Sequence, residues 1–133
     1  MGQTFLGSIE LLSGSCNPAT VSDGRGGIFS WVPEDDIKEF AFLFFNPGKI
    51  RGNHYHPEFV EYFLVVEGAV LVSTIDVKTN NIISKMAGVG TCFRTPIGVS
   101  HAVQAIVASK CISFLTKPWD ECVEPIIYTE ILK

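Results

Sequence analysis

Short apolar segments separated by turn residues run along the whole chain, and this pattern limits the folds that it can adopt. The segments are five to nine residues long, rich in β-branched and aromatic side chains, and lie at residues 5–12, 28–32, 39–46, 59–66, 69–77, 82–86, 102–108 and 111–116. Gly, Asn and Pro between them favour tight turns, because they tolerate or fix unusual backbone angles. Helical periodicity extends at most over single turns, near residues 33–38 and within residues 119–127. We therefore predict an all-β fold.

The number of predicted strands also indicates how they are arranged. Eight or more short strands in 133 residues fit one domain, residues 1–133, built as a double-sheet jelly roll or small β-barrel. An apolar fraction of 47% can supply its core without disulfides. Residues 40–45 are apolar at every position, so both faces of that strand require cover, one from the core and the other from a second layer or a partner subunit.

Charge and cysteine content exclude several classes of function. The net charge is −4 and no basic cluster is present, so nucleic acid is not an expected partner. No apolar run approaches the ~18 residues that cross a membrane, and we expect no membrane partner. Cys16, Cys92, Cys111 and Cys122 lack metal-type spacing, and no secretion signal precedes them, so we expect a reducing cytoplasm.

Histidines and a glutamate mark the candidate site. His54 and His56 are two residues apart, so in a strand their side chains point to the same face. Glu61 alternates with Phe63 on the apolar side of the next strand, where an isolated carboxylate would be too costly without a charged or metal partner. His101 likewise begins an apolar strand. Three imidazoles and one carboxylate suit Zn, Mn, Fe, Ni or Cu, although hydrogen-bonded core histidines are the alternative interpretation.

These residues resemble the two signature motifs of the cupin family, a family of small metal-binding jelly-roll β-barrels. The first motif is filled completely and the second lacks only its final Asn, which Ala105 replaces. The matching residues are Gly48, His54, His56, Glu61 and Gly68 in the first motif, and Gly90, Pro96, Gly98 and His101 in the second. The resemblance implies one divalent transition metal (Zn, Mn, Fe or Ni) on His54, His56, Glu61 and His101. It also implies a homodimer.

A narrower resemblance concerns function. Asp23-Gly-Arg25-Gly26 and Arg51-Gly52-Asn-His54 are similar to elements of cupins that remodel nucleotide-linked keto-sugars. These are the deoxythymidine-diphosphate-sugar 3,5-epimerases, the 3,4-ketoisomerases and the cupin part of a bifunctional capsule-polysaccharide enzyme. The resemblance implies an isomerase or epimerase of polysaccharide biosynthesis that takes a nucleotide sugar as substrate. A metal-dependent dioxygenase and a non-catalytic binding protein are the alternatives.

Such an enzyme removes a proton beside a ketone and returns it elsewhere, which requires a positioned base and stabilisation of the developing charge. A metal-bound imidazole cannot take the proton, so either the histidines act without metal or the base lies elsewhere. Tyr62 and Tyr55 are the first candidates for a separate base, followed by Glu58 and Lys85, with ordinary packing as the alternative for both tyrosines. Arg51, Arg25 and Arg94 are candidate substrate-binding residues, because arginine forks bind diphosphates.

Overall fold

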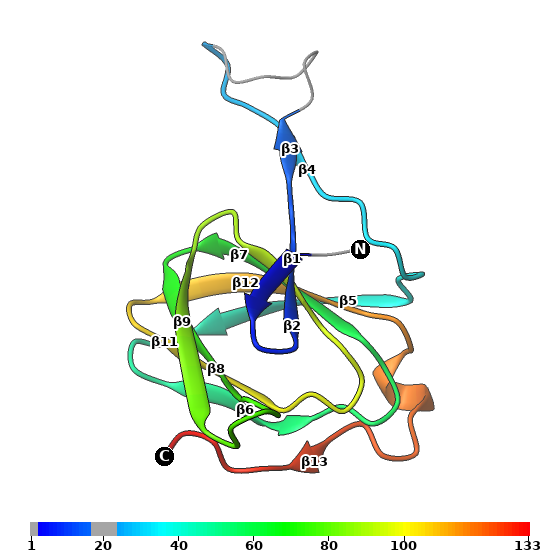
Figure 1. Ribbon diagram of the computed structural model, residues 1–133. Coiled ribbons are helices and arrows are strands. Elements are labelled where there is room, and N and C mark those ends of the chain that lie inside the picture. Colours follow the sequence, from blue (N-terminus) through cyan, green and yellow to red (C-terminus); the bar gives the residue numbers. More distant parts are fainter. Residues whose placement is uncertain (1–2, 17–23) are drawn as a thin grey trace.

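The computed structural model of the protein describes residues 3–16 and 24–133, and its strands form two antiparallel sheets that face each other (Figure 1). The six-stranded sheet has the order β1 (Gln3–Leu6), β2 (Ile9–Leu12), β10 (Cys92–Thr95), β7 (Glu61–Glu67), β12 (Ser109–Leu115) and β5 (Glu39–Phe45). The five-stranded sheet has the order β13 (Ile127–Tyr128), β6 (Ile50–Tyr55), β11 (His101–Ala105), β8 (Ala69–Ile75) and β9 (Ile82–Gly88). The all-β, cupin-like prediction is confirmed.

Two smaller elements complete the chain. Strands β3 (Ser15–Cys16) and β4 (Phe29–Ser30) pair with each other and project from the body of the molecule (Figure 1). A 3-10 turn, η2 (Trp119–Glu121), follows β12. Among the described residues, no helix is long and apolar enough to cross a membrane.

The core lies between the sheets and is organised by aromatic rings. Phe5, Phe93, Phe63 and Phe45 come from four strands of the six-stranded sheet, and successive ring centroids are 5.3, 5.3 and 6.5 Å apart. Small and β-branched side chains of the five-stranded sheet pack opposite them, namely Val70, Val72, Ala87, Val103 and Ala105. The rings bury a large apolar area, which is the main stabilising contribution in a chain of this size.

Several elements differ from the sequence-based prediction. The predicted strand at residues 5–12 is divided into β1 and β2 by a turn at Gly7, which has a positive φ of 57°. Strands β6 and β10 were not predicted, because β6 is mostly polar and β10 is only four residues long. Residues 33–38 lack the expected turn of helix and contain only a bend at residues 34 and 35.

Gly52 brings β6 and β11 close together beside the candidate site. Its φ is 98°, and a Cβ atom at this position would lie 2.8 Å from the carbonyl oxygen of His101. The strand register shifts between His101 and Ala102, so that His101 pairs with His54. A glycine and a local irregularity thus place two histidines side by side on neighbouring strands.

Gly68, between β7 and β8, lies equally close to the backbone of residues 108 and 109 and provides a test of such close packing. Its φ is 87°, and a Cβ atom would lie 2.6 Å from the Ala108 carbonyl oxygen. We expect Gly68→Ala to lower the free energy of unfolding by about 2–4 kcal/mol in urea denaturation, through backbone strain and overlap. Gly88→Ala is the matched control, since no atom lies within 4 Å of its added Cβ. Equal unfolding midpoints for the two variants would contradict the packing described here.

Candidate functional site

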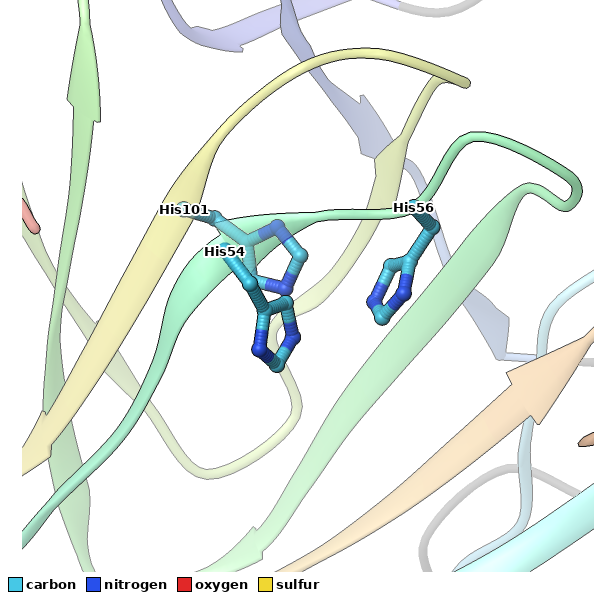
Figure 2. A group of neighbouring side chains, drawn as sticks. All are labelled: His54, His56 and His101. Atoms are coloured by element: carbon cyan, nitrogen blue, oxygen red, sulfur yellow. The ribbon is translucent and has the colours of Figure 1, made fainter. Parts of the chain in front are cut away.

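Three histidines from two neighbouring strands face one another inside the fold (Figure 2). His54 lies in β6, His56 directly follows that strand, and His101 begins β11. Their ring centroids are 4.7 Å apart for His54 and His56, 4.9 Å for His54 and His101, and 5.0 Å for His56 and His101. The convergence expected from the alternation of side chains along the strands is therefore present.

Glu61, the first residue of β7, connects two of these histidines. Its Oε1 atom lies 3.1 Å from Nε2 of His56 and 3.3 Å from Nε2 of His101. Its Oε2 atom accepts a 2.6 Å hydrogen bond from the hydroxyl of Ser113 on β12. Burial by itself raises the pKa of Glu61, but hydrogen bonds with His101 and His56 outweigh it and hold this pKa well below its usual range. The carboxylate is therefore ionised at neutral pH.

Backbone carbonyls determine how the two histidines present their nitrogen atoms. Nδ1 of His56 lies 3.0 Å from the Pro125 carbonyl oxygen, and Nδ1 of His101 lies 3.4 Å from that of Val99. A carbonyl oxygen only accepts hydrogen bonds, so each Nδ1 carries a proton and Nε2 faces the carboxylate. The two Nε2 atoms then carry no proton, and their lone pairs face the negatively charged oxygen of Glu61. This arrangement requires a cation between them, either additional protons or a metal ion.

His54 has a different environment. Burial, followed by the neighbouring charges of His101 and His56, lowers its pKa to about 4, so the ring is neutral at pH 7. Among the described residues, its ring has aromatic neighbours but no hydrogen-bond partner. His54 therefore offers a free lone pair, which can serve as a metal ligand or as a proton acceptor.

The donor set fits a metal ion. One nitrogen from each of the three histidines lies within 4.8 Å of the other two. Two ligands bound to an ion at about 2.1 Å lie roughly 3.0–3.4 Å apart, and the distances from the Glu61 oxygen to His56 and His101, 3.1 and 3.3 Å, match this spacing. Neutral imidazole and carboxylate are ligands that Zn, Mn, Fe and Ni accept.

The four residues lie in a hollow of about 200 Å³. Its walls are mostly apolar and aromatic, and they include Leu43, Phe45, Phe63, Val103 and Trp119. Of the described residues that line it, Arg51 alone is cationic, and its guanidinium lies 5.8 Å from the ring centroid of Phe45. Arg51 thus lies at the hollow, and its role in binding a substrate stays a prediction.

The C-terminal segment is bound to strand β6 through Asn53. Asn53, which adopts a positive φ of 56°, accepts backbone hydrogen bonds of 2.9 Å from Ile131 and Leu132 at its Oδ1 atom. Its carbonyl oxygen accepts another from Thr129 at 2.7 Å. These contacts hold the segment that supplies the Pro125 carbonyl to His56. Sequence reasoning did not find Pro125 or Ser113, although a serine on the apolar inward face of β12 is a detectable signal.

Tyr62 and Arg94 do not lie in the hollow, contrary to expectation. Successive residues of a strand point to opposite faces, so Tyr62 points away from Glu61 to the outer face of the six-stranded sheet. There its hydroxyl donates a 2.6 Å hydrogen bond to Asp35, and Arg94 Nε donates one of 2.7 Å to the same carboxylate oxygen. Burial, followed by the hydrogen bond with Asp35, raises the pKa of Tyr62 to about 12, which does not suit a base at neutral pH.

The remaining candidates also lie outside the hollow. Tyr55 lines a second depression on the other face of β6, and Glu58 forms a 2.8 Å ion pair with Lys117. The Lys85 ammonium lies 5.0 Å from the ring centroid of Phe5. Arg25 is not among the residues that line the hollow, and Asp23, its partner in the sequence motif, lies outside the described residues.

Comparisons with known proteins place this geometry in context. The profile of the family described as polysaccharide biosynthesis C-terminal domain matches residues 21–121. A UDP-2-acetamido-2,6-beta-L-arabino-hexul-4-ose reductase of Pseudomonas aeruginosa is 35% identical over 65 residues, which are 49% of this chain but only 18% of that protein. The chain thus spans about a fifth of this curated relative.

Solved structures share the fold. A 3,4-ketoisomerase from Helicobacter canadensis superposes with a TM-score of 0.76 at 14% identity, covering 92% of this chain and 91% of that one. The capsular polysaccharide assembling protein CapF of Staphylococcus aureus superposes with a TM-score of 0.65 at 21% identity, covering 84% of this chain and 32% of that one. The similarity to nucleotide-sugar-modifying cupins is therefore confirmed at the level of the fold.

Asp35 is the acceptor shared by Tyr62 and Arg94 in the outer-face network, and its removal tests how much this network stabilises the fold. The hydrogen bond from Arg94 lowers the pKa of Asp35. The stabilisation that the ionised Asp35 carboxylate provides is therefore fully present above the pKa of Asp35 in the unfolded chain, and it is lost as pH falls through the lowered pKa of the folded protein. We expect Asp35→Asn to reduce the free energy of unfolding by about 1–2 kcal/mol at pH 7, with the deficit shrinking below about pH 4. Urea unfolding across this range measures it. The exposed neighbour variant Asp36→Asn should differ from the parent by less than about 0.5 kcal/mol. An equal effect of both variants at pH 7 would show that the network contributes nothing.

Proposed function

The chain belongs to the polysaccharide biosynthesis C-terminal domain family, and from this premise we propose that it is an isomerase or epimerase of a nucleotide-linked keto-sugar, with one divalent metal ion in its site. The observation that carries the proposal is the convergence of His54, His56, Glu61 and His101 in one hollow. The P. aeruginosa relative is named a hexul-4-ose reductase and the H. canadensis structure a 3,4-ketoisomerase, and both names support keto-sugar chemistry.

The lining of the hollow suits such a substrate. Aromatic and aliphatic side chains give a surface against which the apolar face of a sugar ring can pack. Arg51 lies at this lining and is exposed, so its guanidinium can reach a diphosphate with forked hydrogen bonds. We assign Arg51 to binding the diphosphate and Trp119 to contacting the sugar or base.

The residues around the proposed ligands prepare them for an ion. The Pro125 carbonyl holds Nδ1 of His56, and Ser113 holds one oxygen of Glu61, so that the opposite atoms face one point. When bound, a divalent ion would polarise a substrate carbonyl and stabilise the charge that develops when a proton leaves the adjacent carbon.

The residues that line the hollow limit the choice of proton acceptor. Apart from the four proposed ligands and Arg51, the described lining has no titratable side chain. His54 is neutral, has no hydrogen-bond partner among the described residues, and does not contact Glu61 as His56 and His101 do. A second arrangement follows, in which the site holds no metal ion and His54 takes the proton itself.

Metal binding is tested by removing one ligand. We load the parent protein separately with Zn, Mn, Fe or Ni and expect it to retain about one ion per chain of at least one of these metals. We expect the His56→Ala variant to lose this ion. The bound metal should also raise the thermal unfolding temperature of the parent and not of the variant, because an ion that binds only the folded state stabilises it. Tyr55→Phe is the control, since this side chain belongs to the other face of β6. Equal metal content in the parent and His56→Ala, measured by elemental analysis, would rule out this site.

Isomerisation is tested by proton exchange with solvent. In deuterated water, we expect incorporation of one deuterium into a UDP-, dTDP- or GDP-linked 4-keto-hexose, detected by mass spectrometry. His54→Asn should reduce the exchange at least 100-fold under either arrangement. Chelation separates the arrangements, because exchange survives it only if His54 acts without metal. Lack of incorporation with all three nucleotide forms would favour the non-catalytic binding alternative.

A further inference from the structure

A second depression lies at the end of the five-stranded sheet where strands β6 and β8 end and β11 begins. The residues that line it are Tyr55, Ile75, Val77, Asn80, Gly98, Val99, Ser100 and Thr129. Its volume is about 430 Å³, compared with about 200 Å³ for the hollow that contains the histidines. It is therefore large enough to be a small-molecule site, since such sites occupy roughly 300–1,000 Å³.

Four side chains bring uncharged polar groups to the second depression. They are the hydroxyls of Tyr55, Ser100 and Thr129 and the amide of Asn80. In the part of the chain that the structure describes, none of these four groups has a hydrogen-bond partner. Each of them can both donate and accept hydrogen bonds. A ligand that covers them must therefore offer several hydrogen-bonding groups, because a desolvated polar group without a partner is costly.

The remaining side chains of the second depression are apolar, and none of the described residues that line it is charged. Ile75, Val77 and Val99 are aliphatic, and the ring of Tyr55 adds an aromatic surface. A metal ion or a diphosphate would meet no side chain of opposite charge here. A purely apolar ligand would leave the covered polar groups without partners. A neutral sugar carries both hydroxyl groups and apolar C–H faces, so it matches both parts of the lining.

Backbone hydrogen bonds hold this lining in place. The N–H of Asn80, a residue with a positive φ of 60°, donates to the Asp76 carbonyl oxygen at 2.7 Å. The N–H of Thr129 donates to the Asn53 carbonyl oxygen, also at 2.7 Å. A ligand that binds to preformed polar groups loses less affinity to the ordering of the protein.

We propose that the second depression is a binding site for a neutral saccharide, separate from the hollow. Tyr55 alternates with His54 and His56 along the chain, so the depression and the hollow lie on opposite faces of β6. A sugar in the depression leaves the histidines accessible. The site depends on neither the metal ion nor the isomerase activity proposed above.

Amide NMR spectra of the parent test whether the depression binds sugar. The probes are glucose, galactose, mannose and N-acetylglucosamine, and we expect at least one to bind with a dissociation constant of about 1–10 mM. The amide signals of residues 75–80, 98–100 and 129 should shift on binding. Those of Leu43 and Val103, which line the hollow, should not. The proposal is overturned if none of the four sugars shifts the signals of the depression at about 50 mM.

Two substitutions remove polar groups of the lining with little change to the backbone. Tyr55→Phe removes a hydroxyl, and Asn80→Gly removes an amide while keeping a residue that adopts positive φ readily. We expect the double variant to raise the dissociation constant of the bound sugar at least 10-fold, and circular dichroism should show that it remains folded. Asn81→Ala is the matched control, because this exposed neighbour is absent from the lining and should not change the affinity.

A variant of the hollow separates this proposal from the proposed function. Trp119→Ala alters the lining of the hollow and should bind the sugar as tightly as the parent does. A sugar whose affinity falls in Trp119→Ala but not in the double variant occupies the hollow, and this result would overturn the proposal. Equal affinity of the parent and the double variant would overturn it as well. Failure of the metal and proton-exchange tests leaves these outcomes unchanged.

Discussion

The buried carboxylate of Glu61 is the interaction on which the site depends. It lies within 3.3 Å of two imidazoles and is held from behind by Ser113. A charge in this position is tolerable only with a positive partner, because the surrounding lining is largely apolar. Protonated histidines or a metal ion can provide it, and the carbonyl contacts to Nδ1 of His56 and His101 leave the Nε2 atom of each ring facing the carboxylate, where either cation could lie.

Both sheets contribute residues to the surroundings of this charge. The six-stranded sheet supplies Glu61 and the stack of phenylalanine rings, whereas the five-stranded sheet supplies His54 and His101. Because the two sets of ligands come from opposite layers, a cation between them would also link the layers. The strand β7 separates two polar networks, one at Glu61 on the inside and one at Tyr62 on the outside. Neither network needs the other for its hydrogen bonds.

The alternation of side chains in strands explains both the success and the failures of the sequence-based predictions. It correctly grouped Glu61 with His101, because each begins an apolar strand and shares its inward face. The same alternation places Tyr62 and Arg94 on the outer face of the six-stranded sheet, so chemical suitability as a base or as a diphosphate ligand is not enough to place a residue at the site. The strand β6 was not predicted because Arg51, Asn53 and His54 make it mostly polar. The Pro125 contact, 69 residues from His56 in the chain, involves a backbone carbonyl and leaves no mark on side-chain composition.

The C-terminal segment extends beyond the family profile, which ends at residue 121. Yet Asn53 holds residues 131 and 132 against β6, and Pro125 orients a proposed ligand. A shortened form that stops where the profile does would keep all three histidines and Glu61, but His56 would lose the carbonyl oxygen that contacts its Nδ1 atom. The structural support of the proposed site is therefore longer than the region that family comparison recognises, and engineered fusions or trimmed versions should retain this tail.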